Sequence, residues 1–157
     1  MDDKTTEVRM PLTAKQLIQV NQAVFSLANA YRSRMVKEGM EVKTGLSLSD
    51  RSTLMVLGQL QPTTAGALSR QMDINPGTVS VYVQRLVERD LVVRSQNEED
   101  RRTWVLSLTP EGRKAYEETL AGTVEYTRDF LTMLTDAEQE ALHGMMLRVA
   151  VGLGHTW

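Results

Sequence analysis

The sequence predicts a mainly α-helical chain with one small β-hairpin, on the basis of three observations. Apolar residues recur at spacings of three and four over most of the 157 residues, which is the period of an amphipathic helix. Two short β-prone runs, 91–95 and 104–108, lie close together and are joined by a polar loop. Long apolar stripes lie before and after this middle part, so the predicted order is four helices, a hairpin and two further helices.

The first two helices follow from their start and stop signals. Thr13 and Gln16 form a capping box, and an apolar stripe then runs towards residue 39. A loop is expected over 40–48, after which Ser49 caps a second helix that Pro62 ends. The apolar stripe of the first helix consists of Leu17, Val20, Val24, Leu27, Tyr31 and Met35.

The third and fourth helices are short and separated by a tight turn. Thr63 or Thr64 caps the third helix, and Asp73 opens the turn after it. Asn75 caps the fourth helix, with Pro76 at the first position, where its missing N–H is not needed. The pair is typical of a helix-turn-helix. The inner face of the fourth helix is predicted to consist of Val79, Val83 and Leu86.

The hairpin leads into two final helices. Thr109 and Pro110 begin the first of these, and Thr135 with Glu138 forms a capping box for the second. The inner side of the first is predicted to hold Tyr116, Leu120, Val124, Leu131 and Leu134. The last helix is predicted to run through Leu142, Met145, Met146, Val149 and Leu153.

Composition excludes several classes of function. Cysteine is absent, so disulfides and thiolate metal sites are excluded, and no acidic cluster accompanies His143 or His155, so no metal is expected. We find no nucleophile with a base, no carboxylate pair and no phosphate-binding glycine loop, so we expect neither an enzyme nor a cofactor. The start lacks an apolar signal segment and no run is long enough for a membrane span, which favours a cytoplasmic protein.

The charge is distributed unevenly. The chain as a whole carries a net charge of −2. Residues 115–157 hold two basic and seven acidic side chains, a net −5, whereas residues 1–114 hold 16 basic and 13 acidic side chains, a net +3. A mildly basic front and an acidic rear are compatible with binding to a polyanion such as DNA.

The outer face of the fourth helix, 75–89, has the chemistry of a helix that reads DNA bases in the major groove. Small or hydroxylated groups in its first turns allow close approach, and a glutamine and an arginine can bond to base edges or phosphates. A merely solvated face would more often carry Glu and Lys. The residues predicted to contact DNA here are Pro76, Gly77, Thr78, Ser80, Val81, Gln84 and Arg85.

The hairpin tip is predicted to contact the minor groove. Asp100, Arg101 and Arg102 stand just before the second strand, and the carboxylate of Asp100 is expected to hold the Arg102 guanidinium by a charge-assisted pair. An arginine on a thin ribbon suits a narrow minor groove, where the potential is most negative. Glu98 and Glu99 are expected to point away from phosphates. Trp104 is expected to pack on the hairpin.

These residues carry a resemblance to a known family. The run from Asp100 to Thr109, D-R-R-T-W-V-L-S-L-T, followed by Gly112, resembles the D-x-R…L-T-x-x-G signature of the MarR family of bacterial and archaeal transcriptional regulators. The match continues upstream through the fourth helix, and the helix order fits nearly the whole chain. One departure is Asp90, where the family usually has a glycine; the position favours a left-handed backbone, which Asp tolerates.

The resemblance implies a winged helix-turn-helix that acts as a repressor on a pseudo-palindromic operator in double-stranded DNA. It also implies relief of repression by a small phenolic or anionic effector, and a homodimer whose terminal helices interleave. Arg102 matches the wing arginine of the family and Asp100 its orienting partner. The expected layout is a single domain over 1–157, with dimerisation helices at 13–39 and 110–153 and the DNA-binding lobe at 49–109.

Two interpretations stay open. The terminal helices outgrow a compact core of short helices and a hairpin, which favours a dimer over packing within one subunit. Tyr31, Met35 and Met55 are candidates to line an effector cavity, although Met and Tyr at helical spacing are commonly core residues. The alternative function is a winged-helix module that binds protein without DNA, for which Val81 and Tyr82 on the outer face leave room.

Overall fold

The computed structural model describes residues 11–37, 45–97 and 100–154, with the side chains of 34–37 left out. The chain divides into two units, residues 1–39 and residues 40–157. The first contains the helix α1 (Ala14–Lys37), which starts at the predicted capping box: the Thr13 amide donates to Gln16 Oε1 at 2.9 Å, and the Gln16 amide donates back to Thr13 Oγ1 at 3.3 Å.

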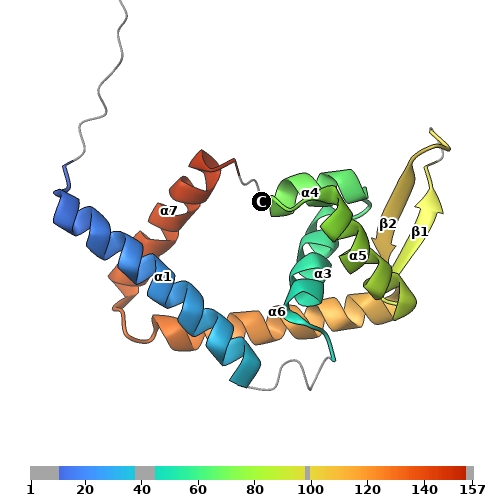
Figure 1. Ribbon diagram of the computed structural model, residues 1–157. Coiled ribbons are helices and arrows are strands. Elements are labelled where there is room, and N and C mark those ends of the chain that lie inside the picture. Colours follow the sequence, from blue (N-terminus) through green and yellow to red (C-terminus); the bar gives the residue numbers. More distant parts are fainter. Residues whose placement is uncertain (1–10, 38–44, 98–99, 155–157) are drawn as a thin grey trace, which may run out of the picture. The chain divides into compact units, whose positions relative to one another are not determined.

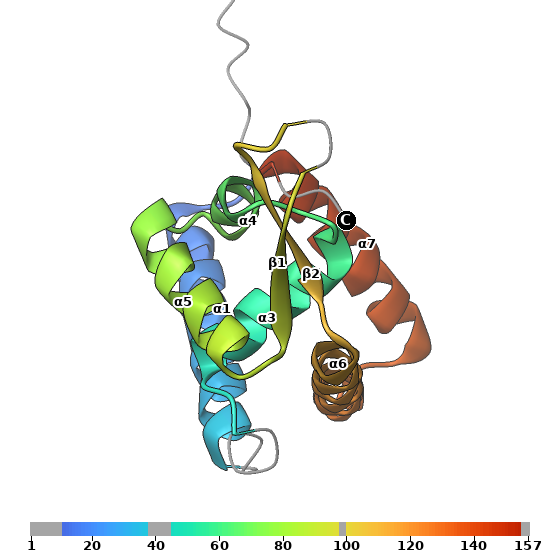
Figure 2. The ribbon, with the colours of Figure 1, turned by 90° about the vertical axis from the view of Figure 1, so that its right-hand side faces the viewer.

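The second unit begins with a helix-turn-helix and its wing (Figures 1 and 2). Its helices are α3 (Leu48–Leu60), α4 (Ala65–Met72) and α5 (Pro76–Glu88). The strands β1 (Val92–Gln96) and β2 (Trp104–Leu108) then pair antiparallel, with Arg94 opposite Leu106. The hairpin, hereafter the wing, extends beyond the helices, with its turn at the far end. The predicted element order and the mainly α fold with a β-hairpin are confirmed.

One apolar core holds α3, α4, α5 and the wing together. Thr63, just before α4, adds a backbone bridge to the sheet: its amide donates to the Leu106 carbonyl at 3.1 Å and the Leu106 amide returns a bond of 2.7 Å. The predicted inner face of α5 is buried as expected. The cluster consists of Leu46, Leu54, Leu57, Leu68, Val79, Val83, Leu86, Val92 and Leu106.

The caps of these helices agree with the sequence except at one point. Thr64 caps α4 and Asn75 caps α5 with Pro76 at the first position, as predicted. The prediction of Ser49 as the cap of α3 was wrong, because Ser47 fills that role and α3 starts at Leu48. Ser47 is the cap because Asp50 stands three residues later. The Asp50 amide donates to Ser47 Oγ, and Ser47 Oγ donates to the Asp50 carboxylate at 2.7 Å.

Two further helices follow the wing. These are α6 (Pro110–Leu131), capped by Thr109, and α7 (Asp136–Gly152), which begins at the predicted capping box of Thr135 and Glu138. The predicted inner side of α6 was partly wrong. The residues that α6 buries are Gly112, Thr119 and Tyr126, whereas Leu120 and Val124 are exposed. Close packing near the lobe favours small residues there rather than leucines.

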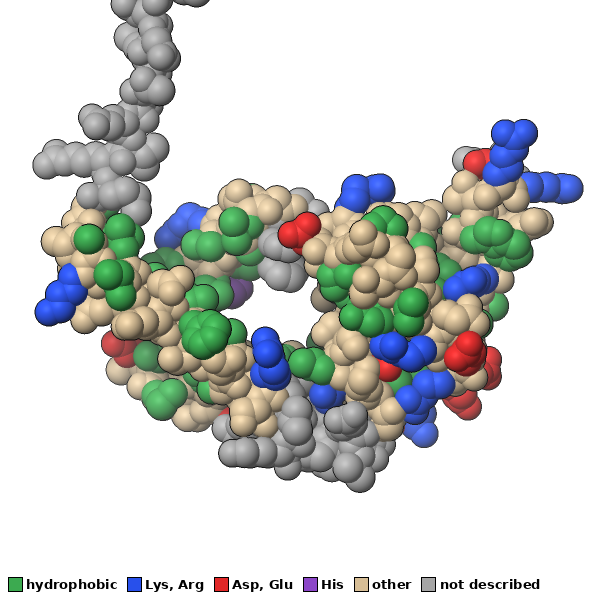
Figure 3. Space-filling model, viewed as in Figure 1, with side chains coloured by type: hydrophobic (Ala, Val, Ile, Leu, Met, Phe, Trp, Pro, Cys, Tyr) green, Lys and Arg blue, Asp and Glu red, His purple; other side chains and the backbone are tan. Residues whose placement is uncertain are grey.

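The terminal helices display much apolar surface. Every described side chain of α1 is exposed except Tyr31, which is half-buried, and α7 has no buried residue. Met145, Met146, Val149 and Leu153 of α7 are exposed within this chain. Apolar side chains are visible on the surface of α1 in Figure 3. No described helix is long and apolar enough to cross a membrane.

The junction between wing and α6 explains the L-T-x-x-G motif. Thr109 donates through its amide to the Leu91 carbonyl at 3.1 Å and through its hydroxyl to the Asp90 carbonyl at 2.6 Å. Its hydroxyl also accepts from the Gly112 amide at 2.9 Å. A Cβ on Gly112 would lie 1.8 Å from the Leu91 oxygen, so only glycine permits this approach. Asp90 has φ 56°, the left-handed backbone expected at this position.

Replacing Gly112 by Ala should therefore destabilise the protein. The new Cβ meets a backbone oxygen that cannot rotate away, so we expect a loss of about 3 kcal/mol in the free energy of unfolding. Urea denaturation followed by circular dichroism measures this loss. Gly66→Ala is the matched control, since it also lies in the first turn of a helix but meets only ordinary contacts near 3.8 Å. Equal unfolding free energies for the two variants would contradict the packing argument.

Candidate nucleic-acid interface

The start of α5 is fixed by short-range hydrogen bonds. Asn75 Oδ1 accepts from the Gly77 amide at 2.8 Å, and Ser80 Oγ donates to the Pro76 carbonyl at 2.8 Å. The Ser80 hydroxyl proton is thus used within the helix, and its oxygen remains available as an acceptor. The first turn of α5 is held in shape before any ligand arrives.

The outward face of α5 holds most of the residues predicted from the sequence. Pro76, Gly77 and Ser80 are exposed, as are Val81 and Gln84, while Thr78 is half-buried. Val79, Val83 and Leu86 on the opposite face are buried in the core. The lobe therefore presents small, hydroxylated and amide groups along one side of a 13-residue helix.

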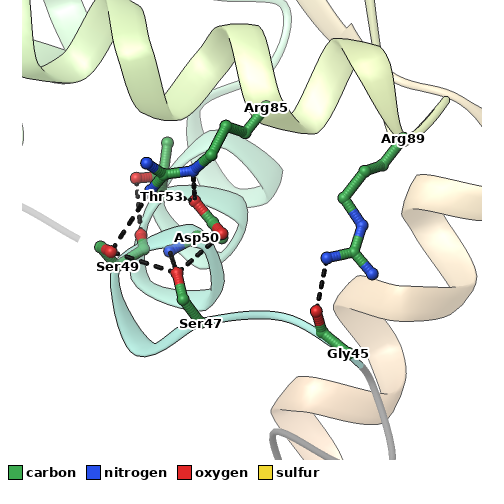
Figure 4. A network of polar contacts seen from close by, with 7 residues as sticks. All are labelled: Gly45, Ser47, Ser49, Asp50, Thr53, Arg85 and Arg89. Atoms are coloured by element: carbon green, nitrogen blue, oxygen red, sulfur yellow. Dashed lines mark hydrogen bonds and ion pairs between the residues drawn. The ribbon is translucent and has the colours of Figure 1, made fainter.

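Arg85 has an intramolecular partner that the sequence did not reveal. Its Nε and Nη2 donate to Asp50 Oδ1 at 2.9 and 2.6 Å, and Nη2 lies 3.5 Å from Ser49 Oγ (Figure 4). The guanidinium also stacks over Tyr82, 4.9 Å from the ring centre. Asp50 is buried, so the pair joins the first turn of α3 to the recognition helix. Free reach of Arg85 towards a base would require this pair to break.

Arg89, one turn further on, ties a second point of α5 to the same segment. Its Nη1 donates to the carbonyl of Gly45, just before the cap of α3 (Figure 4). Arg85 of α5 and Arg89 at its C-cap thus bind the segment that leads into α3. Because 35 residues separate Arg85 from Asp50, no local pattern in the sequence could indicate this contact.

The far end of the wing carries a structured turn. The expected pairing of Asp100 with the Arg102 guanidinium is not found: Asp100 Oδ1 accepts from the Arg102 backbone amide at 3.0 Å and Oδ2 from Thr103 Oγ1 at 2.8 Å. The turn brings these donors to the carboxylate, whereas the guanidinium projects outward. The Thr103 hydroxyl and the Arg102 amide lower the pKa of Asp100, so the carboxylate holds the turn in its charged form.

Arg101 and Arg102 are therefore carried on a fixed turn, with their side chains exposed. Figure 3 shows basic side chains projecting from the far end of the wing. Within residues 100–154 and the other described ranges, neither guanidinium has a hydrogen bond or ion pair. Glu98 and Glu99, predicted to point away, lie outside the described residues.

A buried arginine in α3 was missed at the sequence level. Arg51 is 2% exposed, and its Nε and Nη1 have no hydrogen-bond partner; they are the only such buried side-chain atoms in the described part of the chain. Met55, one turn further along α3, is half-buried. Because a guanidinium stays charged, burying it without an acceptor is costly. Its place in an apolar-spaced helix gave no sign of this burial.

The other candidate ligand residues lie on α1. Tyr31 is half-buried there, and the side chain of Met35 is outside the described residues. Among the residues that the structure describes, no group of three His, Asp or Glu side chains could hold a metal ion.

Comparisons with known proteins agree with this geometry. The model of the family described as "MarR family" matches residues 46–104. The HTH-type transcriptional repressor MdtR of Bacillus subtilis is 33% identical over 107 residues, which cover 68% of this chain and 68% of that protein. A probable transcriptional regulator from Pseudomonas aeruginosa is 31% identical, with a TM-score of 0.65, over 83% of this chain and 98% of that one.

The fold also matches a structure solved with nucleic acid. Streptococcus pneumoniae FabT in complex with DNA has a TM-score of 0.70 at 18% identity, covering 86% of this chain and 97% of that one. The relatives and fold neighbours are transcriptional regulators rather than enzymes. This chain belongs to the MarR family of winged-helix, DNA-binding transcriptional regulators.

Proposed function

We propose that this protein is a ligand-responsive repressor that binds a pseudo-palindromic operator as a homodimer in the cytoplasm. The observation that carries the proposal is the combination of α5 and the wing in one lobe. The helix presents an outward face without acidic side chains over its first turns, and the wing presents two arginines on a fixed turn, with no partner for their guanidinium groups among the described residues. The related MdtR is itself named a repressor.

In this proposal α5 enters the major groove. Gly77 and Ser80 let the helix approach base edges closely, and Val81, 53% exposed, can touch a thymine methyl. Gln84 offers an amide that can bond to adenine. The Thr78 amide can bind a backbone phosphate, since Pro76 has no N–H and the Gly77 and Val79 amides donate to Asn75. Arg85, held by Asp50, would serve mainly to fix α5 on α3 and would reach DNA only if that pair opened.

The wing would place Arg102 in the flanking minor groove. Asp100 restrains the backbone at Arg102 rather than its guanidinium, so the turn fixes where the side chain emerges and leaves the charge free. A free guanidinium on a narrow ribbon suits the strongly negative potential of a narrow minor groove. Arg101 beside it would contact the backbone phosphates.

Replacing Arg102 by Ala should weaken DNA binding by about 1–3 kcal/mol per lobe, the magnitude of a specific base contact. Fluorescence anisotropy on a duplex selected by the wild-type protein measures this change. Arg128→Ala, which removes an exposed arginine from α6, is the matched control for charge. Equal affinities for the wild type and Arg102→Ala would contradict the proposed role of the wing.

A dimer would explain the unburied apolar side chains of the terminal helices. Leu17, Val20 and Val24 of α1 are 39%, 52% and 60% exposed, and the Met and Val side chains of α7 are also exposed. A second copy would cover such stripes and bring two lobes to half-sites about 10 bp apart.

Val24→Asp should therefore give a monomer that binds the operator at least tenfold more weakly, because a charge in an apolar helix contact is costly. Analytical ultracentrifugation and anisotropy measure the two effects. Gln19→Asp places the same charge on the opposite side of α1 and should leave the dimer intact. A Val24→Asp protein that sediments as a dimer would contradict this assignment of the interface.

The effector part of the proposal is supported by Arg51. A buried guanidinium whose Nε and Nη1 have no partner among the described residues favours an anion, and a carboxylate can accept a charge-assisted hydrogen bond from either nitrogen. Met55 on the same side of α3 would provide apolar contact for the rest of such a ligand. Tyr31 and Met35 stay candidate effector residues on the basis of the sequence alone.

Arg51→Met should weaken binding of salicylate, used here as an aromatic carboxylate probe. We expect at least a tenfold loss, since a hydrogen bond to a charged group contributes roughly 1.5–3 kcal/mol. Isothermal titration calorimetry measures it, with Arg113→Met, an exposed arginine of α6, as control. The variant should be no less stable to urea than the wild type, because an unpaired buried charge is removed. Unchanged salicylate affinity would count against Arg51 as the anion ligand.

A further inference from the structure

Three side chains form a hydrogen-bonded chain between the wing and α5. Arg94 Nη2, from β1, donates to Gln84 Oε1 at 3.1 Å, and Gln84 Nε2 donates to Glu88 Oε1 at 3.0 Å. Gln84 and Glu88 lie one turn apart on α5, so the chain runs along the helix and then crosses to the wing. We call Arg94, Gln84 and Glu88 the Gln84 brace.

The register of the wing explains how Arg94 reaches the helix. Arg94 pairs with Leu106, which is 2% exposed, so it lies on the face of the hairpin that packs towards the core. It lines a hollow of about 160 Å³ together with Ser80 of α5 and Trp104 of β2. Trp104, which was expected to pack on the hairpin, lines this hollow and is 54% exposed. From the wing, Arg94 reaches Gln84 of α5.

The chemistry of the amide gives the brace its consequence. A glutamine oxygen can accept two hydrogen bonds and its nitrogen can donate two. The brace uses one acceptor position of Oε1 and one hydrogen of Nε2, and it thereby fixes the positions of the amide oxygen and nitrogen. A flipped amide would set its NH₂ against a guanidinium and its oxygen against a carboxylate. One acceptor and one donor remain, which is the pair needed to bond to N6 and N7 of adenine.

We propose that Glu88 and Arg94 are positioning residues that set the base preference of Gln84. The inference rests on the proposed entry of α5 into the major groove. With the brace, Gln84 meets the base with its oxygen and nitrogen already ordered, so one base pair of each half-site is favoured. Without either partner the amide can flip, and bases that need the opposite order of donor and acceptor are no longer rejected.

Glu88 and Arg94 also have ordinary interpretations that make different predictions. Glu88 and Gln84 could be a solvated pair one turn apart, which contributes little. Arg94 could be a phosphate contact, which weakens binding to all sequences equally when lost. The brace alone predicts a loss confined to one base pair.

The test uses the full-length protein and duplexes that the wild type selects from a random-sequence pool. Fluorescence anisotropy then compares the selected duplex with a panel in which each base pair is changed in turn. In Glu88→Ala and in Arg94→Met, discrimination at one base pair of the half-site should fall roughly tenfold, the order of one paired side chain–base contact. The other positions should keep their preferences.

Charge provides an internal control. Glu88→Ala removes a negative charge and Arg94→Met a positive one, so their effects on affinity for the selected duplex should differ in sign. Their effects on discrimination should coincide. Glu117→Ala, an exposed acid of α6, controls for the loss of a carboxylate. Gln84→Ala should lose the same base preference. Adding Glu88→Ala to Gln84→Ala should change that base preference no further, because the two residues act as one unit.

The outcomes separate the two levels of the argument. If the wild type selects no sequence, the proposed DNA-binding function fails and the brace fails with it. If it selects a sequence and both variants keep every base preference, only the role of the brace is overturned. A change spread evenly over all positions would overturn it too, since a phosphate contact or a solvated pair gives that result.

Discussion

The angle between the recognition helix and the wing depends on one tight backbone junction. At the foot of the hairpin, the Leu91 amide donates to the Leu86 carbonyl at 2.9 Å, while the Leu91 carbonyl accepts from Thr109 at 3.1 Å. The same carbonyl lies where a side chain on Gly112 would have to be. Leu91, which precedes β1, therefore bonds both to the end of α5 and to the cap of α6. Any loosening there would move the wing relative to the surface of α5.

Side chains hold α5 at two further places. Asp50 and Gly45 accept from two arginines of α5 and bind it to the start of α3, and Arg94 ties its middle to the wing. With its inner face in the core, only the outward face of the helix stays free. A helix held on so many sides can present donors and acceptors in fixed positions, which lowers the entropic cost of binding a rigid partner such as duplex DNA.

Local patterns in the sequence were enough for the inner face of α5 and for the helix starts other than that of α3, where Ser47 rather than Ser49 is the cap. Caps such as Asn75 and Thr135 act within three residues, so their effect is visible in the sequence. The buried face of α6 was not predictable in this way, because it depends on how closely another element approaches and uses Gly112 and Thr119 rather than leucines. The MarR signature supplied the family, but neither the partner of Arg85 nor the burial of Arg51, which depend on tertiary packing.

The wing turn shows the limit of local reasoning most clearly. From spacing alone, Asp100 is equally able to hold the guanidinium or the backbone of Arg102. The turn decides for the backbone, since the Arg102 amide and the Thr103 hydroxyl both point at the carboxylate. The candidate site nonetheless keeps the predicted location, because the two arginines remain exposed at the end of the ribbon.

Three carboxylates of the lobe have partners within the chain. Asp50 forms an ion pair with Arg85, Asp100 holds the wing turn, and Glu88 orders an amide. These three carboxylates thus act on internal donors, while the guanidinium groups of Arg101 and Arg102 have no hydrogen bond or ion pair to any of the described residues. A chain with a net charge of −2 can therefore attract phosphate at the wing and still read bases through neutral hydrogen-bonding groups on α5. For such a protein the position of the unpaired cations, more than the total charge, decides where a polyanion binds.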